Sequence, residues 1–174
     1  KSFIPEVFNF ENIDYYSMRF YATDISRGPD GKFWVINDRT QSPSGLGYAI
    51  ENRLTMNSIS NDLYPNVEIL KMAKFIEGFK NMLKSLCSSN QDNPLIALLT
   101  PGPLNETYFE HSYISSFLDL TLVQGEDLLV KNNQLWLKSL NGLRKVDTLL
   151  RRVDSQYCDP LELRNDSQLG VAGL

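Results

Sequence analysis

The densest group of side chains able to do chemistry follows the apolar run LIALL at residues 95–99. After a Pro-Gly-Pro turn come Asn105, Glu106, Glu110 and the chain's one histidine, His111. A capped helix explains this pattern without any function, because Asn is a good N-cap and acids complement the helix dipole. The alternative is a ligand site at the carboxyl end of a strand, where two acids favour an amine over a phosphate.

The arginines suggest anion binding, because a guanidinium fork grips carboxylate or phosphate at two points. Arg39, Arg53, Arg151 and Arg152 lie at expected loop edges or strand ends. Side chains alternate along a strand, so at most one of Arg151 and Arg152 points into any given pocket. The competing interpretation is that both are paired with acids nearby in the sequence: Asp147, Asp154 and Asp159.

The stretch GLGYAI, residues 45–50, imitates the start of a dinucleotide-binding fingerprint. Its third glycine is missing and no strand-borne acid follows at the required distance, so the match is weak. The glycines let the loop bend or close over a ligand. We expect the loop Thr40–Gly47 to be mobile or poorly packed, since its Gly, Ser and Pro residues offer few apolar contacts.

The composition excludes several classes of protein. A net charge of −4 argues against a nucleic-acid partner or an anionic membrane surface, and 42% hydrophobic with 22% charged residues is typical of a globular protein. Two cysteines far apart predict neither a disulfide framework nor a zinc site, and they suit the cytoplasm. One histidine rules out a multi-histidine metal site but leaves an oxygen-ligand site for Mg²⁺.

Strand-like and helix-like segments alternate, which predicts an α/β fold with a partly parallel sheet covered by helices. In such sheets ligands collect at the carboxyl ends of the strands. The chain begins without a methionine and its last residues read as the start of a helix after Asn165, so we expect a piece of a longer protein. The expected elements are strands at 18–25, 32–38, 94–99, 120–123 and 146–153, helices at 48–59, 66–87 and 105–118, and a hairpin at 128–138.

Three long motifs in this order carry a family resemblance. RGPDGKFWVINDRTQSPSGLGYAIENR (27–53), LLTPGPLNETYFEHSYISSFL (98–118) and LLRRVDSQYCDPLELRNDSQLGVAGL (149–174) together resemble the circularly permuted ATP-grasp proteins of uncharacterised function. That family is distantly similar to glutathionylspermidine synthases. The resemblance covers most of the chain and implies that it is the amino-terminal part of a longer protein.

The resemblance implies a ligase that activates a carboxylate as an acyl phosphate for attack by an amine, using ATP and Mg²⁺. Asn37 and Asp38 are the implied metal ligands, and Arg39 and Asp38 the implied catalytic residues. Val35 stands where the family's fold has an acid, which weakens the magnesium assignment. Ser44, Gly45, Gly47 and Arg53 are the implied nucleotide-binding residues. We do not expect ATP or Mg²⁺ to bind this piece by itself.

The resemblance also divides the chain. Residues 1–60 would form an arm, a hairpin and a helix at the edge of the ATP-grasp domain. Residues 61–174 would form a Rossmann-like substrate-side domain, truncated at its carboxyl end. The implied partners are small carboxylate and amine substrates and the rest of the chain, with no nucleic acid or membrane. The implied substrate-binding residues are Asn105, Glu106, Glu110, Arg151 and Arg152.

Two rival functions stay open at the level of sequence. A non-catalytic binding module that keeps the fold is favoured by the missing acid at Val35. A Rossmann-like nucleotide-binding enzyme is favoured by GLGYAI alone.

Overall fold

The computed structural model describes residues 18–60, 72–87 and 93–174, and within them it is a mixed α/β fold. The helices are α1 (Leu46–Ser60), α2 (Ala73–Ser85) and α3 (Tyr108–Leu118). The strands are β1 (Ala22–Arg27), β2 (Phe33–Arg39), β3 (Ile96–Leu99), β4 (Thr121–Val123), β5 (Leu128–Lys131), β6 (Gln134–Ser139), β7 (Gly142–Lys145) and β8 (Thr148–Arg151). Short 3-10 helices occupy Gly125–Asp127 and Ser155–Tyr157.

A three-stranded parallel sheet lies at the centre, with β3 between β4 and β8. All four residues of β3 are buried, because both faces of this strand are covered. Ile96 and Leu98 face α2 and α3, where they pack with residues such as Phe79 and Ile114. Ala97 and Leu99 face the opposite side.

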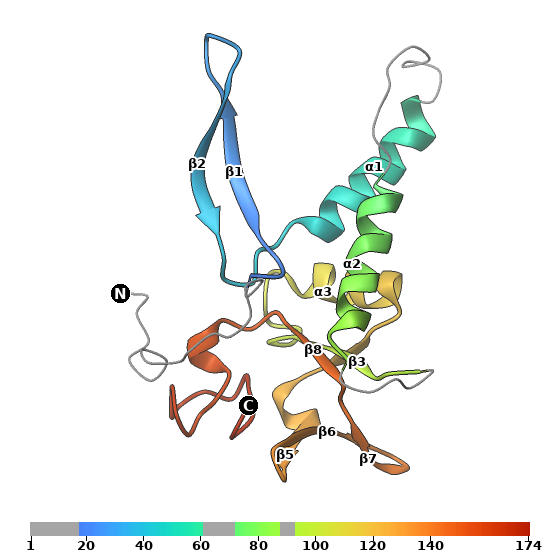
Figure 1. The fold of residues 1–174 in the computed structure, drawn as a ribbon, viewed down its shortest axis with the longest axis vertical. Coiled ribbons are helices and arrows are strands. Elements are labelled where there is room, and N and C mark those ends of the chain that lie inside the picture. The colour runs from blue at the N-terminus through green and yellow to red at the C-terminus, as the bar shows by residue number, and fades with distance from the viewer. Residues whose placement is uncertain (1–17, 61–71, 88–92) are drawn as a thin grey trace.

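That opposite face is covered by other β structure and by the chain's last segment. β5, β6 and β7 form an antiparallel sheet, and Leu128, Leu135 and Leu137 from it pack against the core around Leu99. Figure 1 shows this small sheet at the bottom of the molecule, below β3 and β8. The central sheet is therefore fixed from both faces, which holds the carboxyl ends of its strands in place.

The hairpin β1–β2 extends away from this body (Figure 1). Its strands are antiparallel, and the turn between them closes with the Gly28 amide donating to Lys32 O at 2.8 Å. Gly31 has φ +79°, a conformation that side-chain-bearing residues rarely adopt. All seven residues of β2 are exposed.

The partly parallel sheet predicted from the sequence is confirmed, and the expected helices and strands have counterparts in the described residues. The first part of the helix expected at 66–87 lies outside the described residues, and α2 covers Ala73–Ser85. The Rossmann-like comparison stays a prediction. The helix expected after Asn165 is wrong: this segment forms turns. It turns because Val171 donates its amide to Cys158 O and Gly170 lies so close to the Cys158 backbone that a side chain would collide.

The predicted division at residue 60 stays a prediction too, and the predicted amino-terminal arm lies outside the described residues, which begin at residue 18. The helices α1 and α3 pack directly on each other. The Tyr48 and Phe109 rings meet there with centroids 6.1 Å apart. Within the described ranges, no helix is both long and apolar enough to cross a membrane.

Candidate functional site

A cavity of about 330 Å³ opens at the carboxyl ends of β3 and β8, where α/β sheets collect ligands. Three segments distant in sequence form its wall: the loop after β2, the segment after β3 that leads into α3, and the residues after β8. Its lining residues are Ser42, Ser44, Pro101, Asn105, Glu106, Thr107, His111, Arg152, Val153, Asp154, Tyr157 and Leu169.

Arg152 is the buried cation of this cavity, with 5% of its surface exposed. Its Nη2 donates to Pro43 O at 2.5 Å, and its guanidinium carbon lies 5.5 Å from the centre of the Phe20 ring. Its Nε is buried and has no hydrogen-bond partner among the described residues. Burial lowers the pKa of Arg152, and the nearby Glu110 carboxylate opposes this shift. Arg152 is thus a buried charge with bonding capacity left.

Glu110 is fully buried and binds the loop that precedes α1. Its two carboxylate oxygens each accept the Gly45 amide at 2.8 Å, and Oε1 also accepts the Gly47 amide at 3.3 Å. A Cβ on Gly47 would meet Glu110 Cγ at 2.8 Å, so a glycine is needed there. Glu110 therefore caps the amino terminus of α1 and does not line the cavity. Its direct contact with substrate stays a prediction.

The expectation of a poorly packed loop at 40–47 is wrong. Ser42 Oγ donates to Val153 O at 3.3 Å, and Gln41 exchanges side-chain hydrogen bonds with Ser155. Pro43 is buried, and Leu46 packs against the apolar cluster between α2, α3 and the sheet. The loop has few apolar residues, which suggested poor packing, but hydrogen bonds from its polar side chains and backbone groups hold it in place.

His111 lies inside the site rather than on the surface, with 1% of its area exposed. Nδ1 is 2.9 Å from the Thr100 hydroxyl, and Nε2 is 3.1 Å from the Thr107 hydroxyl. Burial, and then the charge of Arg152, lower the pKa of His111 to about 4. The imidazole is therefore neutral at pH 7. Sequence reasoning considered His111 but left it out of the predicted site residues, although its position four residues after Thr107 puts both on one helix face.

Arg151 points away from this cavity, as strand alternation predicts. Its Nη1 donates to Val153 O at 2.7 Å and lies 3.7 Å from Cys158 Sγ. Burial raises the pKa of the Cys158 thiol, partly opposed by Arg151. The structure thus separates two adjacent arginines, with Arg152 alone placed at the cavity.

The residues before α3 reach the cavity from its other side. Asn105 Oδ1 accepts the Thr107 amide at 2.9 Å and the Thr107 hydroxyl at 2.5 Å. This bonding orders the turn, and α3 begins at Tyr108 rather than at Asn105. Glu106 is exposed at the cavity rim, so its carboxylate is accessible to a ligand.

The predicted catalytic and metal residues lie on the exposed hairpin. Arg39 Nε donates to both Asp24 oxygens, at 3.1 and 3.0 Å, and its Nη2 lies 2.9 Å from Asp24 Oδ2. Asn37 stands opposite Asp24 in the register and donates to it at 3.4 Å. Asp38 accepts the Tyr21 hydroxyl at 2.5 Å, away from that group, because neighbouring positions alternate.

Asp24 binds two of the predicted hairpin residues, Asn37 and Arg39, and sequence reasoning missed it. The pairing of the strands brings this acid of β1 opposite Asn37, and the register shifts between Asp24 and Ile25, so the sequence pattern alone does not reveal the contact. The Arg39 guanidinium lowers the pKa of Asp24, and Asp24 raises that of Arg39. Within the described ranges no group of three or more His, Cys, Asp or Glu residues can hold a metal.

The predicted nucleotide-binding residues are not gathered at one place. Ser44 lines the cavity, whereas Gly45 and Gly47 use their amides to bind Glu110. Arg53 lies half-buried further along α1 and does not line the cavity. Nucleotide binding by these residues stays a prediction.

Comparisons with known proteins assign a family. All 174 residues match the family described as circularly permuted ATP-grasp type 2. An uncharacterised protein of Mycobacterium tuberculosis is 41% identical over 154 residues, covering 88% of this chain and 17% of that protein.

Further relatives give the same result. A second uncharacterised protein of M. tuberculosis is 37% identical, covering 87% of this chain and 27% of its own length. One of Synechocystis is 36% identical, covering 88% and 32%. The chain thus spans less than a third of these relatives. With the family match extending over the whole sequence, the chain belongs to the circularly permuted ATP-grasp type 2 family.

Proposed function

We propose that the protein containing this chain is an ATP-dependent ligase that joins a carboxylate to an amine. The cavity at the ends of β3 and β8 would bind the carboxylate substrate. The observation that carries this proposal is Arg152, a buried guanidinium that lines the cavity and keeps an Nε without a hydrogen-bond partner in the described part of the chain. Membership of an ATP-grasp family supports the proposed reaction class.

The surroundings of Arg152 suit a carboxylate ligand. A buried cation gains more from an anion that bonds it directly than an exposed cation does, because the surroundings screen the attraction less. Glu110 is near enough to affect the pKa of Arg152, but both its oxygens are occupied by loop amides. His111 is neutral at pH 7, and the two other acids that line the cavity, Glu106 and Asp154, are exposed, so that water screens their charges. A substrate carboxylate would therefore be the natural partner of Arg152.

The loop after β2 connects this cavity to the hairpin. Ser42 and Ser44 line the cavity only a few residues beyond Arg39. Glu110 holds the far end of that loop through Gly45 and Gly47. The catalytic groups proposed on β2 are thus tethered to the substrate cavity by a loop fixed at several points.

The oxygen donors of the hairpin fit a partial magnesium site. Mg²⁺ typically uses one or two carboxylates together with substrate phosphates. Asp24 offers a carboxylate and Asn37 a carboxamide oxygen at one register position, with Asp38 on the neighbouring position. Magnesium–ATP would supply the phosphoryl group that activates the carboxylate. Arg39 would orient Asp24 through its paired hydrogen bonds.

The test is ADP formation by the full-length protein with Mg²⁺–ATP and a library of carboxylates combined with amines, amino acids and peptides. We expect turnover that requires both a carboxylate and an amine, and a mass-identified amide product. Asp24→Asn should abolish turnover. Asp30→Asn, a matched change in the turn of the same hairpin, should keep it. No ADP formation with any pair would contradict the proposed function.

A non-catalytic binding module is the second candidate. Val35 supports it, because it is 62% exposed on β2 where an acid is expected. Ligand binding at the Arg152 cavity without ATP turnover would favour this candidate.

A further inference from the structure

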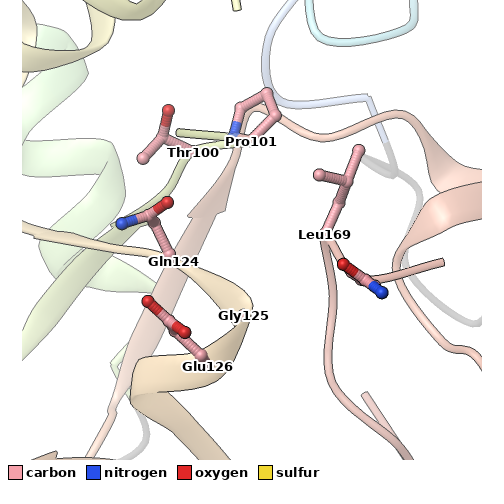
Figure 2. A pocket seen from close by; sticks show the side chains of 7 residues that line it. Thr100, Pro101, Gln124, Gly125, Glu126 and Leu169 are labelled. Atoms are coloured by element: carbon pink, nitrogen blue, oxygen red, sulfur yellow. The ribbon is translucent and has the colours of Figure 1, made fainter. Parts of the chain in front are cut away.

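A second cavity, of about 430 Å³, lies at the carboxyl ends of β3 and β4. Its polar lining comes from Thr100, which follows β3, from Gln124 and Glu126, which follow β4, and from Gln168 near the chain's end. Figure 2 shows Thr100, Gln124 and Glu126 on one side of the space and Leu169 on the other.

Two polar side chains of this cavity, Thr100 and Gln124, are held by their surroundings, whereas Glu126 and Gln168 are exposed. The Thr100 hydroxyl, on a residue 1% exposed, accepts the Gly102 amide at 3.2 Å and bonds to His111. The Gln124 carboxamide lies against Gly102, whose φ of +97° and lack of a Cβ leave room for it. The backbone N–H of Gln124 donates to Asp127 Oδ2 at 2.8 Å, which fixes the turn carrying Glu126.

The two cavities differ in charge. Of the seven residues that line this one, Glu126 is the only one that ionises, and no cation is among them. The first cavity has the cation Arg152 buried in its wall and two exposed acids, Glu106 and Asp154, so only the first cavity offers a cation to an anionic ligand. Pro101 and Leu169 line both, so the two spaces share a wall. An anionic ligand in the first cavity and a cationic ligand in the second would match these charges.

We propose that the cavity of Thr100, Gln124, Glu126 and Gln168 binds the ammonium group of the amine-bearing substrate. This inference rests on the proposed function, because a ligase must hold its amine substrate beside its carboxylate substrate. An ammonium group has three donors and no acceptor. The Glu126 carboxylate and the two carboxamide oxygens supply acceptors, and Glu126 balances the charge.

The binding itself is measurable without ATP. The experiment is ligand-observed NMR on the full-length protein, with glycinamide as the cationic probe and N-acetylglycine as the anionic one. Glu126→Gln keeps the shape of the side chain and removes its charge. It should weaken glycinamide binding roughly ten-fold, the effect of one charged hydrogen bond, and leave N-acetylglycine binding unchanged.

A matched control separates this effect from a general loss of negative charge. Glu77→Gln, on an exposed position of α2 outside both cavities, should change neither probe's affinity. The inference is overturned if wild-type protein does not bind glycinamide, if Glu126→Gln leaves its affinity unchanged, or if Glu77→Gln weakens it equally. Selective loss in Glu126→Gln alone supports it. Since no ATP is present, a failed turnover assay would refute the ligase without removing this amine site.

Discussion

The exposed hairpin and the buried strand ends hold their charged groups in different ways. On the hairpin, Asn37 and Arg39 both bind Asp24, and 43% of the Asp24 side chain and 54% of the Arg39 side chain are exposed. At the strand ends, Glu110 and Arg152 are almost completely buried, and backbone groups of the loop before α1 bind them. The charged groups of the hairpin are held by solvent-exposed side-chain pairs, and those at the strand ends are held by buried contacts with the backbone.

This difference predicts which interactions stabilise the fold and which serve only function. Exposed ion pairs contribute little because water and salt screen them, whereas a buried charge that loses its partners is costly. Changes at the strand ends should therefore lower stability, while changes on the hairpin should affect activity alone.

The largest expected effect on stability is that of Glu110→Ala. It leaves the Gly45 and Gly47 amides without their acceptor and Arg152 without its nearby carboxylate. We expect the free energy of unfolding to fall by about 3 to 5 kcal/mol, measured by urea denaturation. Glu106→Ala, at the exposed rim, is the matched control and should change little. Equal losses in the two variants would show that the loop does not depend on Glu110.

The pH dependence of stability tests the burial of His111. Its folded pKa of about 4 lies below the ordinary 6.5, so the unfolded chain binds a proton first as pH falls. This histidine's contribution is complete above pH 6.5 and is lost towards pH 4, by about 3 kcal/mol in total. Urea midpoints between pH 5 and 7.5 should show this slope, and His111→Gln should flatten it. An unchanged slope would mean that His111 titrates normally.

Gly47→Ala and Gly78→Ala form a matched pair of helix substitutions with opposite expected signs. In Gly47→Ala the new Cβ meets Glu110 Cγ at 2.8 Å, which should cost about 1 to 2 kcal/mol. In Gly78→Ala nothing lies within 4 Å, so the higher helix propensity should stabilise by up to about 1 kcal/mol. Thermal denaturation of both variants distinguishes the two signs. Stabilisation by both would contradict the tight contact between α1 and α3.

The smallest stability effect is expected for Asp24→Asn. Asp24 and Arg39 are exposed, so removing their pairing should leave the urea midpoint at pH 7 unchanged within error. The lowered pKa of Asp24 gives the sign: its small contribution is present above its ordinary pKa and is lost as pH falls below it. A midpoint shift comparable to that of Glu110→Ala would remove the contrast between the two regions.

The sequence predicted local features well, because they depend on neighbouring residues. Apolar runs gave β3 and β4, turn residues gave the hairpin β1–β2, and alternation separated Arg151 from Arg152. The family resemblance is confirmed over the whole chain.

Long-range contacts could not be predicted from the sequence, because the spacing of residues along the chain does not indicate which distant segments meet. Gly45 binds Glu110 from 65 positions away, and Arg152 binds Pro43 from 109. Those two contacts turned an expected loose loop into an ordered wall of the cavity. The contact with Gly45 also makes Glu110, a predicted substrate ligand, the cap of α1. The pairing of Asp24 with Asn37 likewise required the register of the hairpin.

The central claim is that Arg152 binds the substrate carboxylate, and its adjacent arginine provides the control. The measurement is the affinity of the full-length protein for N-acetylglycine, by ligand-observed NMR, in Arg152→Gln and Arg151→Gln. We predict that Arg152→Gln weakens binding at least roughly ten-fold, the loss of one charge-assisted contact, while Arg151→Gln changes it less than about three-fold. Equal effects, or a larger effect for Arg151→Gln, would contradict the claim.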